Sequence, residues 1–284
     1  MRWDENLRRD IMEIPFVKLQ GNGNDFVLID EMGGIVIPEE MKGEFARFYC
    51  DRRFGVGADG VLFVSPSESC DVRMRLLQPD ESEAEMCGNG IRCLAKYVYD
   101  SEYTGKECTV ETMAGVMAVS MTYRDEGDFT ATIDMGPADF TSEGIPAKGE
   151  GEFSMEYDGF TVYAANTGVP HAVVFVDDVE AVDIRGVAPG IRSNPMFPEG
   201  VNVNFVQCDG EDTITIRTFE RGVEDETFSC GTGSTASAAV AHHLGKMPAT
   251  IHVETRGGPL TIRINDTVKM EGPAVTVFEG IIPL

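Results

Sequence analysis

The chain alternates between short runs of β-branched and aromatic residues and polar connections that are rich in glycine. Such runs, bounded by turn-forming residues, are typical of buried or half-buried β-strands. Strands are predicted over residues 26–29, 60–64, 72–77, 116–121, 130–135, 160–164, 172–176, 203–207, 213–219, 250–254 and 260–264. Helical periodicity is clearest directly after two cysteines. The pattern therefore predicts a protein of many short strands with a few helices.

The two predicted helix starts share one motif. Cys87 opens the segment CGNGIRCLAKY and Cys230 opens CGTGSTASAAV, and each follows a predicted strand and an acidic loop. The two cysteines lie about half the chain length apart, and nearly the same offset separates Gly23 from Gly168, each ahead of a predicted strand. Because the cysteine pair and the glycine pair are separated by nearly the same number of residues, we predict an internal duplication with two similar domains that face each other. The segment 136–152, rich in Gly and Glu, is the predicted linker.

A cysteine at the start of a helix has unusual chemistry. The first turn of a helix leaves backbone N–H groups unpaired and carries about half a positive charge, which lowers the pKa of a thiol placed there. The same N–H groups bind carboxylates, and glycines let a ligand approach the backbone closely. Two such elements that face each other would place an acid–base group on each side of a trapped substrate carbon.

A purely structural role is the alternative for every cysteine, because single cysteines are commonly small buried apolar residues. We give this interpretation to Cys50, Cys70, Cys93, Cys108 and Cys208. The repeated Cys-Gly-x-Gly motif favours a function for Cys87 and Cys230. Neither a disulfide framework nor a metal site is predicted, since the cysteines lack C-x-x-C spacing and the four histidines complete no zinc pattern.

The charge balance limits the partners. With 48 acidic and 23 basic residues the formal net charge is -25, so nucleic acids and anionic membranes would be repelled. No run is long and apolar enough to span a bilayer, and residues 1–11 have the composition of an N-terminal tail. These features predict a soluble, cytoplasmic protein.

Four segments, in order, carry a resemblance to the diaminopimelate epimerase family. They are FVKLQGNGNDFVLID, CDRRFGVGADGVLFV, MRLLQPDESEAEMCGNGIRCLAKY and IRTFERGVEDETFSCGTGSTASAA, and the similarity extends from about Pro15 to the C-terminus. The resemblance implies reversible epimerisation of LL-2,6-diaminopimelate to the meso form in lysine biosynthesis, without pyridoxal phosphate or a metal. A homodimer is compatible with it.

The resemblance also implies the fold class, α+β, with two pseudo-symmetric domains that each wrap a curved, mostly antiparallel sheet around a central helix. The first domain would comprise residues 12–134 and the returning strand 275–284, and the second would comprise residues 135–274.

Individual roles follow from the same resemblance. Cys87 is expected to donate and Cys230 to accept a proton in the LL-to-meso direction, with the roles exchanged in reverse. The expected substrate-binding residues are Asn24, Gln78, Gly88, Asn89, Asn202, Glu220, Arg221, Gly231 and Thr232. His171 and Glu220 are expected to tune the thiols. On the residues alone, a structural histidine is the simpler interpretation of His171, and Glu220-Arg221 could equally be a solvated charge pair.

The chain differs from the common family pattern at Gln78, Val169 and Gly60, positions expected on the side that recognises the distal end of the substrate. Two alternatives therefore stay open. One is an epimerase or racemase of the same fold that acts on another amino acid, and the other is a non-catalytic thiol pair that senses redox state.

Overall fold

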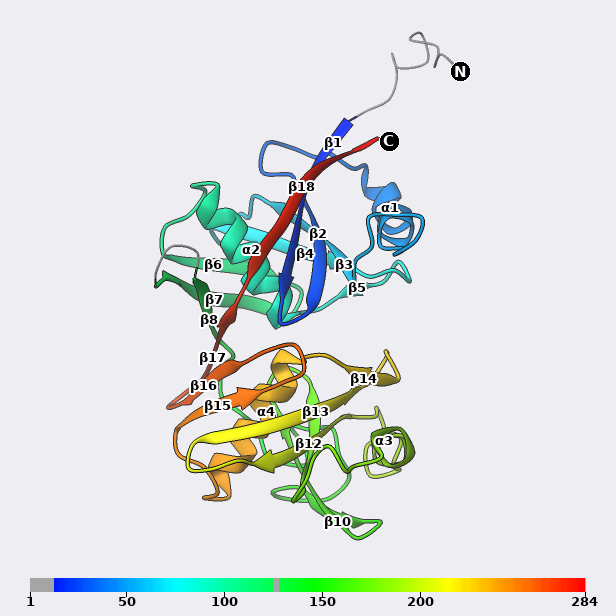
Figure 1. Cartoon of the computed structure of the whole chain (residues 1–284), viewed down its shortest axis with the longest axis vertical. Helices are drawn as coiled ribbons and strands as arrows, with labels where there is room; N and C mark the ends of the chain where they lie inside the picture. The colour runs from blue at the N-terminus through cyan, green and yellow to red at the C-terminus, as the bar shows by residue number, and fades with distance from the viewer. Residues whose placement is uncertain (1–12, 125–127, 284) are drawn as a thin grey trace.

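The computed structural model describes residues 13–124 and 128–283, which form two lobes stacked along the long axis of the molecule (Figure 1). The predicted tail, residues 1–11, lies outside the described residues. Within these ranges no helix is long and apolar enough to cross a membrane.

The first half of the chain contributes eight strands and two α-helices to the described structure. Its elements are β1 (Glu13–Gly21), β2 (Asn24–Asp30), the short 3-10 helix η2 (Glu39–Met41), α1 (Lys42–Tyr49), β3 (Gly60–Ser65), β4 (Val72–Leu77), β5 (Glu83–Ala84), α2 (Gly88–Asp100), β6 (Glu107–Thr112), β7 (Gly115–Tyr123) and β8 (Phe129–Asp134).

The second half repeats this order. Its elements are β9 (Ser154–Tyr157), β10 (Phe160–Asn166), β11 (Pro170–Phe175), α3 (Ile184–Arg192), β12 (Asn202–Cys208), β13 (Thr213–Glu220), β14 (Asp225–Thr227), α4 (Gly231–His243), β15 (Thr250–Glu254), β16 (Leu260–Ile264), β17 (Val268–Pro273) and β18 (Val275–Pro283). Each strand predicted from the pattern is present within one or two residues of its predicted limits, and both predicted helices follow their cysteines.

The strand pairing is the same in the two halves. In the first, β1–β2, β3–β4, β6–β7 and β7–β8 pair antiparallel, while β2–β3 and β4–β6 pair parallel. In the second, β10–β11, β12–β13, β15–β16 and β16–β17 pair antiparallel, while β11–β12 and β13–β15 pair parallel. The helices occupy equivalent places, so the topology agrees with the predicted duplication and with the α+β class.

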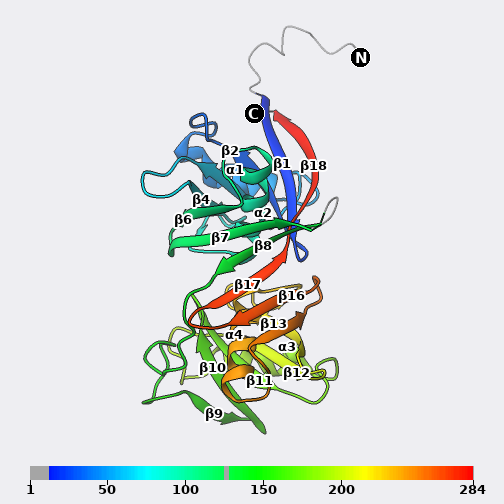
Figure 2. The ribbon, with the colours of Figure 1, turned by 90° about the vertical axis from the view of Figure 1, so that its left-hand side faces the viewer.

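The halves are joined by their edge strands. The last strand of the first repeat, β8, pairs antiparallel with the last strand of the second repeat, β17, and Ile133 lies opposite Met270. Beyond them, β18 crosses back to the first half and pairs with β1 from Glu13↔Pro283 to Gln20↔Val275, whereas β9 forms a hairpin with the neighbouring β10 inside the second half (Figure 2). The domain limits stated above remain a prediction.

The helices α2 and α4 lie inside their sheets. In α2 the apolar residues Ile91, Leu94, Ala95 and Val98 are fully buried. In α4 every residue from Gly231 to Ala241 is buried, and almost all of them are Gly, Ser, Thr or Ala. Small side chains let strands approach an enclosed helix on all sides, which is why this sequence can be helical without an exposed polar face.

Arg92, in the second turn of α2, is the largest fully buried side chain. Its guanidinium donates to the carbonyl of Pro273, the last residue of β17, and to the side-chain oxygens of Asn22 and Asn89. Burial lowers its pKa to about 10, so it stays a cation at neutral pH. One buried side chain therefore ties the β1–β2 turn, the first turn of α2 and the end of β17 together.

We predict that Arg92→Ala lowers the free energy of unfolding by about 3 kcal/mol or more, because it leaves three buried acceptors unpaired and opens a cavity. Urea unfolding followed by circular dichroism measures the change. Arg47→Ala, which removes an exposed arginine paired with Glu81, should cost less than about 1 kcal/mol. Equal, small losses in the two variants would contradict the bracing role of Arg92.

Candidate active site

The first turns of α2 and α4 meet between the lobes. Cys87 is the N-cap of α2 and Cys230 is the N-cap of α4, as their motifs predict. A Cβ on Gly231 would lie 3.8 Å from the Cα of Gly88 and 3.0 Å from Met270 Sδ, and a Cβ on Gly88 would lie 2.6 Å from the methyl carbon of Met270. The first glycine of each motif therefore lets the two helix starts approach each other closely around the end of the Met270 side chain, which would have to move to make room for a Cβ.

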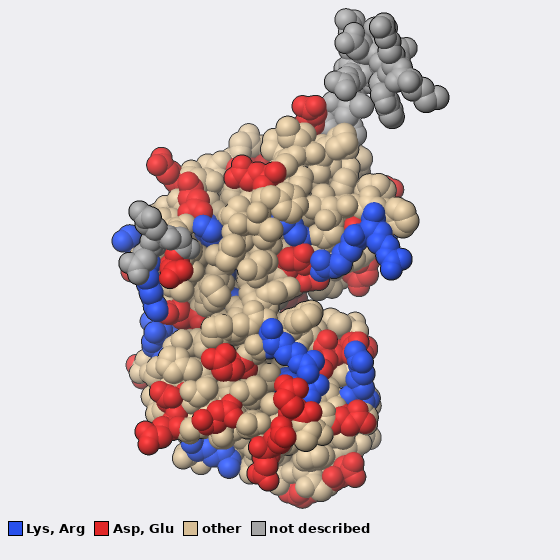
Figure 3. All heavy atoms as spheres, in the orientation of Figure 1, with Lys and Arg blue, Asp and Glu red and all other residues tan. Residues whose placement is uncertain are grey.

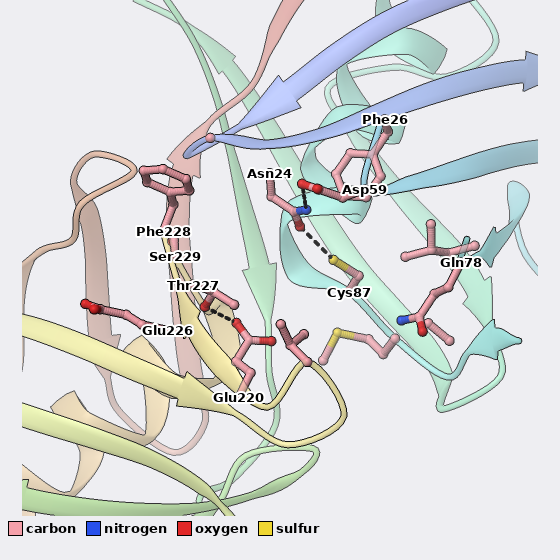
Figure 4. A pocket seen from close by; sticks show the side chains of 15 residues that line it. Asn24, Phe26, Asp59, Gln78, Cys87, Glu220, Glu226, Thr227, Phe228 and Ser229 are labelled. Carbon is pink, nitrogen blue, oxygen red and sulfur yellow. Dashed lines mark hydrogen bonds between the residues drawn. The ribbon is translucent and has the colours of Figure 1, made fainter. Parts of the chain in front are cut away.

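A cavity of about 380 Å³ opens beside this meeting point, and both halves of the chain line it. It is visible as a notch between the lobes at one edge of the molecule (Figure 3). Among the predicted site residues, Asn24, Gln78, Cys87 and Glu220 line it, and their side chains converge on it in Figure 4. Cys230, Thr232, His171, Asn202 and Arg221 lie outside this lining.

Cys87 has two hydrogen-bond partners in the first half. Its sulfur accepts from the Gly90 amide at 3.4 Å, and its thiol donates to Asn24 Oδ1 at 3.6 Å. The Asn24 amide is oriented by Asp59, whose carboxylate accepts from Nδ2 at 2.6 Å, so only the oxygen end can face the sulfur. Asn24 therefore presents an acceptor to Cys87, as the dashed lines in Figure 4 trace.

Cys230 has different partners. Its sulfur lies 3.4 Å from Thr232 Oγ1, and the Glu220 carboxylate interacts with the same thiol. Glu220 also accepts from the Thr227 hydroxyl. The two cysteines thus have the same place at a helix start but unlike side-chain neighbours.

The pKa of each thiol is raised in this structure, and burial is the largest cause. The negative charge of Glu220 raises the pKa of both, while the amide N–H groups of Gly90 and Gly233 act in the opposite direction. The sequence led us to expect lowered values from the helix starts. The N–H groups of the helix starts do lower the pKa of the two thiols, but the cost of burying a thiolate in a closed site raises it by more.

His171 is fully buried on β11 and contacts Cys230 only through Thr232. Its Nε2 lies 2.8 Å from Thr232 Oγ1 and its Nδ1 lies 3.1 Å from Asn204 Nδ2. Burial, followed by the charge of Arg221, lowers the pKa of His171 to about 3, so the imidazole is neutral at physiological pH. Asn204 was not expected at the site, because nothing in the sequence distinguishes it from the other residues of the predicted strand 203–207.

Glu220 and Arg221 are neighbours of opposite charge, yet among the described residues neither forms an ion pair. The Arg221 guanidinium donates to the carbonyls of Glu199 and Gly200. Burial raises the pKa of Glu220. Asn202 uses its amide to join the Pro170 carbonyl to the Arg221 backbone N–H, and its expected role in substrate binding stays a prediction.

The remaining predicted residues surround the helix starts. Asn89 is buried and donates to Asn24 Oδ1 and to the Ser229 carbonyl, which connects the two halves. Gln78 is exposed at the cavity edge and accepts from Ser82. Sequence reasoning missed Asp59, Phe228 and Met86, which also line the cavity. Asp59 belongs to the segment CDRRFGVGADGVLFV, so its motif was visible although its contact with Asn24 was not.

No group of His, Cys, Asp or Glu in the described ranges is arranged to hold a metal ion. Seven cysteines are free thiols. The site combines two thiols, the N–H groups of two helix starts and the carboxylates of Asp59, Glu220 and Glu226.

The diaminopimelate epimerase family model matches residues 16–141 and 163–277, which include both cysteine motifs. The chain belongs to the diaminopimelate epimerase family. It is 54% identical to a diaminopimelate epimerase from Methanothrix thermoacetophila, over 95% of this chain and 96% of the relative. It is 52% identical to one from Archaeoglobus fulgidus, over 96% of this chain and 98% of the relative. The expected family is confirmed, and so is the expected class of enzyme, an isomerase.

Solved structures of low sequence identity share the fold. A PhzF-family phenazine biosynthesis protein from Bacillus anthracis superposes with a TM-score of 0.72 at 18% identity, covering 95% of this chain and 99% of that one. A hydroxyproline epimerase from Agrobacterium vitis gives a TM-score of 0.65 at 17% identity, covering 100% of this chain and 94% of that one. These likenesses confirm the two-domain α+β architecture.

We predict that Glu220→Gln moves the pH midpoint of iodoacetamide alkylation of Cys230 to lower pH. A neighbouring carboxylate disfavours a thiolate, so removing its charge makes the thiolate easier to form. Mass spectrometry of the peptide that contains Cys230 separates its reaction from those of the other cysteines. Glu224→Gln, in the same loop but exposed and paired with Arg192, should leave the midpoint in place; an upward shift in Glu220→Gln would refute the assignment.

Proposed function

We propose that this protein interconverts LL-2,6-diaminopimelate and meso-2,6-diaminopimelate, with Cys87 and Cys230 as its two acid–base groups. The observation that carries the proposal is the meeting of two cysteine-capped helix starts beside a cavity that Cys87 and Glu220 line, in a chain of the diaminopimelate epimerase family. The substrate carbon would lie between the sulfurs. One thiolate removes its proton while the other thiol delivers a proton to the opposite face.

Electrostatics at the helix starts lower the main barrier. A carbon that bears an ammonium and a carboxylate is a weak acid, so the negative charge that develops on deprotonation must be stabilised. The N–H groups after Cys87 and Cys230 belong to Gly88, Asn89, Gly231 and Thr232, and they can hold the reacting carboxylate from two sides. Burial of the site excludes water and strengthens these interactions.

The distal end of the substrate is also zwitterionic, and Glu220 and Arg221 suit it. Because neither forms an ion pair among the described residues, the carboxylate can bind an ammonium and the guanidinium can bind a carboxylate. Asn24 and Gln78 line the cavity, and Asn202 holds Arg221 in place. A homodimer working in the cytoplasm, with domains of residues 12–134 plus 275–284 and 135–274, belongs to the same proposal.

The proposal is tested by incubating reduced protein with LL-diaminopimelate in deuterated water. Deuterium should appear at one α-carbon as the meso form accumulates, measured by NMR and mass spectrometry. Cys87→Ala and Cys230→Ala should each lower the rate by about 10²–10⁴-fold, because each removes a general acid–base group.

Cys208→Ala, which changes an exposed cysteine, is the matched control and should retain the full rate. If both active-site variants keep the wild-type rate, the two-cysteine mechanism is wrong. If deuterium enters another amino acid but not diaminopimelate, the protein is an epimerase of the same fold with a different substrate. If deuterium enters none, the catalytic proposal fails.

A further inference from the structure

The fully buried Asn204 on β12 has one possible orientation of its amide. Its Nδ2 donates to the Ala172 carbonyl at 3.0 Å and to His171 Nδ1 at 3.1 Å, and its Oδ1 accepts from the Thr218 hydroxyl at 2.9 Å. A carbonyl oxygen only accepts, so the end that faces Ala172 must be the NH₂ group. The second N–H of that group points at His171.

The orientation of Asn204 decides the tautomer of His171. Because Nδ1 accepts a hydrogen bond, it carries a lone pair, and a neutral imidazole must then carry its proton on Nε2. The Nε2–H donates to Thr232 Oγ1 at 2.8 Å. With that oxygen already accepting, the hydroxyl proton of Thr232 is free to point at Cys230 Sγ, 3.4 Å away.

We propose that Asn204 is a positioning residue that holds His171 in the Nε2–H tautomer, so that Thr232 donates its hydroxyl proton to the Cys230 thiolate. Hydrogen bonds then run in one direction, from Asn204 through His171 and Thr232 to the sulfur. The consequence for catalysis rests on the proposed function, whereas the tautomer can be measured without substrate.

This chain of donors gives Cys230 a partner in each protonation state. As a thiol it can donate to Glu220, whose charge favours the protonated form. As a thiolate it accepts from Thr232 and from the Gly233 amide, and both interactions lower its pKa. A thiol that acts as an acid and as a base in one catalytic cycle needs a neighbour that accepts a hydrogen bond and a neighbour that donates one. The charge of Arg221 also acts on His171 and lowers its pKa.

The packing around Asn204 leaves little freedom for another arrangement. A Cβ on Gly233 would lie 2.4 Å from Asn204 Oδ1 and 3.3 Å from His171 Cε1. The second glycine of the Cys230 motif is therefore required by the Asn204–His171 pair. In the Cys87 motif the equivalent Gly90 faces Leu62 instead, so this relay is specific to one thiol.

The test is NMR of the ligand-free protein with ¹⁵N-labelled histidine, which distinguishes a protonated ring nitrogen from an unprotonated one. In the wild-type protein His171 should have a protonated Nε2 and an unprotonated Nδ1. Asn204→Asp replaces the donor by an acceptor of the same shape. At about pH 9, above the range in which histidine titrates, this variant should place the proton on Nδ1.

Thr218→Val removes the neighbour on the oxygen side of Asn204 and should leave the proton on Nε2. In the epimerisation assay Asn204→Asp should lower kcat about tenfold or more with little change in KM, because a hydrogen bond to a charged sulfur is lost. A wild-type His171 with its proton on Nδ1 would overturn the proposal, and that result needs no variant to fold. Absence of diaminopimelate turnover with the expected tautomer would instead count against the proposed function alone.

Discussion

The positive ends of two buried helices, α2 and α4, point at the same small volume, and most of the site follows from this constraint. Helix N-termini carry partial positive charge and unpaired N–H groups, so two that face each other repel unless an anion lies between them. Arg92 adds a buried cation behind one of them. The structure therefore creates a place that can hold the carboxylate of a substrate, while burial keeps the pKa of the two thiols raised.

The strands hold the helices in this unfavourable arrangement. β8 and β17 join the two halves edge to edge, and β18 crosses from the second half to pair with β1 in the first. Met270, opposite Ile133 in the β8–β17 ladder, extends its side chain between Gly88 and Gly231. The interface between the lobes is thus continuous with the sheet hydrogen bonding, which can offset the repulsion of the helix starts.

The duplication produces two similar thiols, but their neighbours differ. Cys87 faces the oxygen of Asn24, oriented by Asp59, and this arrangement favours the protonated form. Cys230 lies between the Glu220 carboxylate and the Thr232 hydroxyl, so it has both an acceptor and a donor. The duplicated backbone therefore holds two thiols whose side-chain neighbours differ. This difference suits the proposed reaction, in which the two thiols act on opposite faces of one substrate carbon.

The sequence by itself determined the periodic elements and the helix starts. Alternating apolar runs predicted the strands, and the repeated Cys-Gly-x-Gly motif predicted two helices with cysteine N-caps, because these signals depend on residues close together in the chain. The strands β6, β9 and β17 and the helices α1 and α3 were not predicted from the sequence.

Only the tertiary structure decided which side chains meet. Asp59 orients Asn24, Asn204 orients His171, and Met270 separates the two glycines, and each of these contacts joins residues from different strands or helices. The pKa directions of the thiols also depended on it, because burial is set by the whole fold and here opposes what a helix start alone would do. Secondary structure depends on residues that are close together in the chain, so the sequence can predict it. Desolvation and the direction of hydrogen bonds depend on residues that only folding brings together.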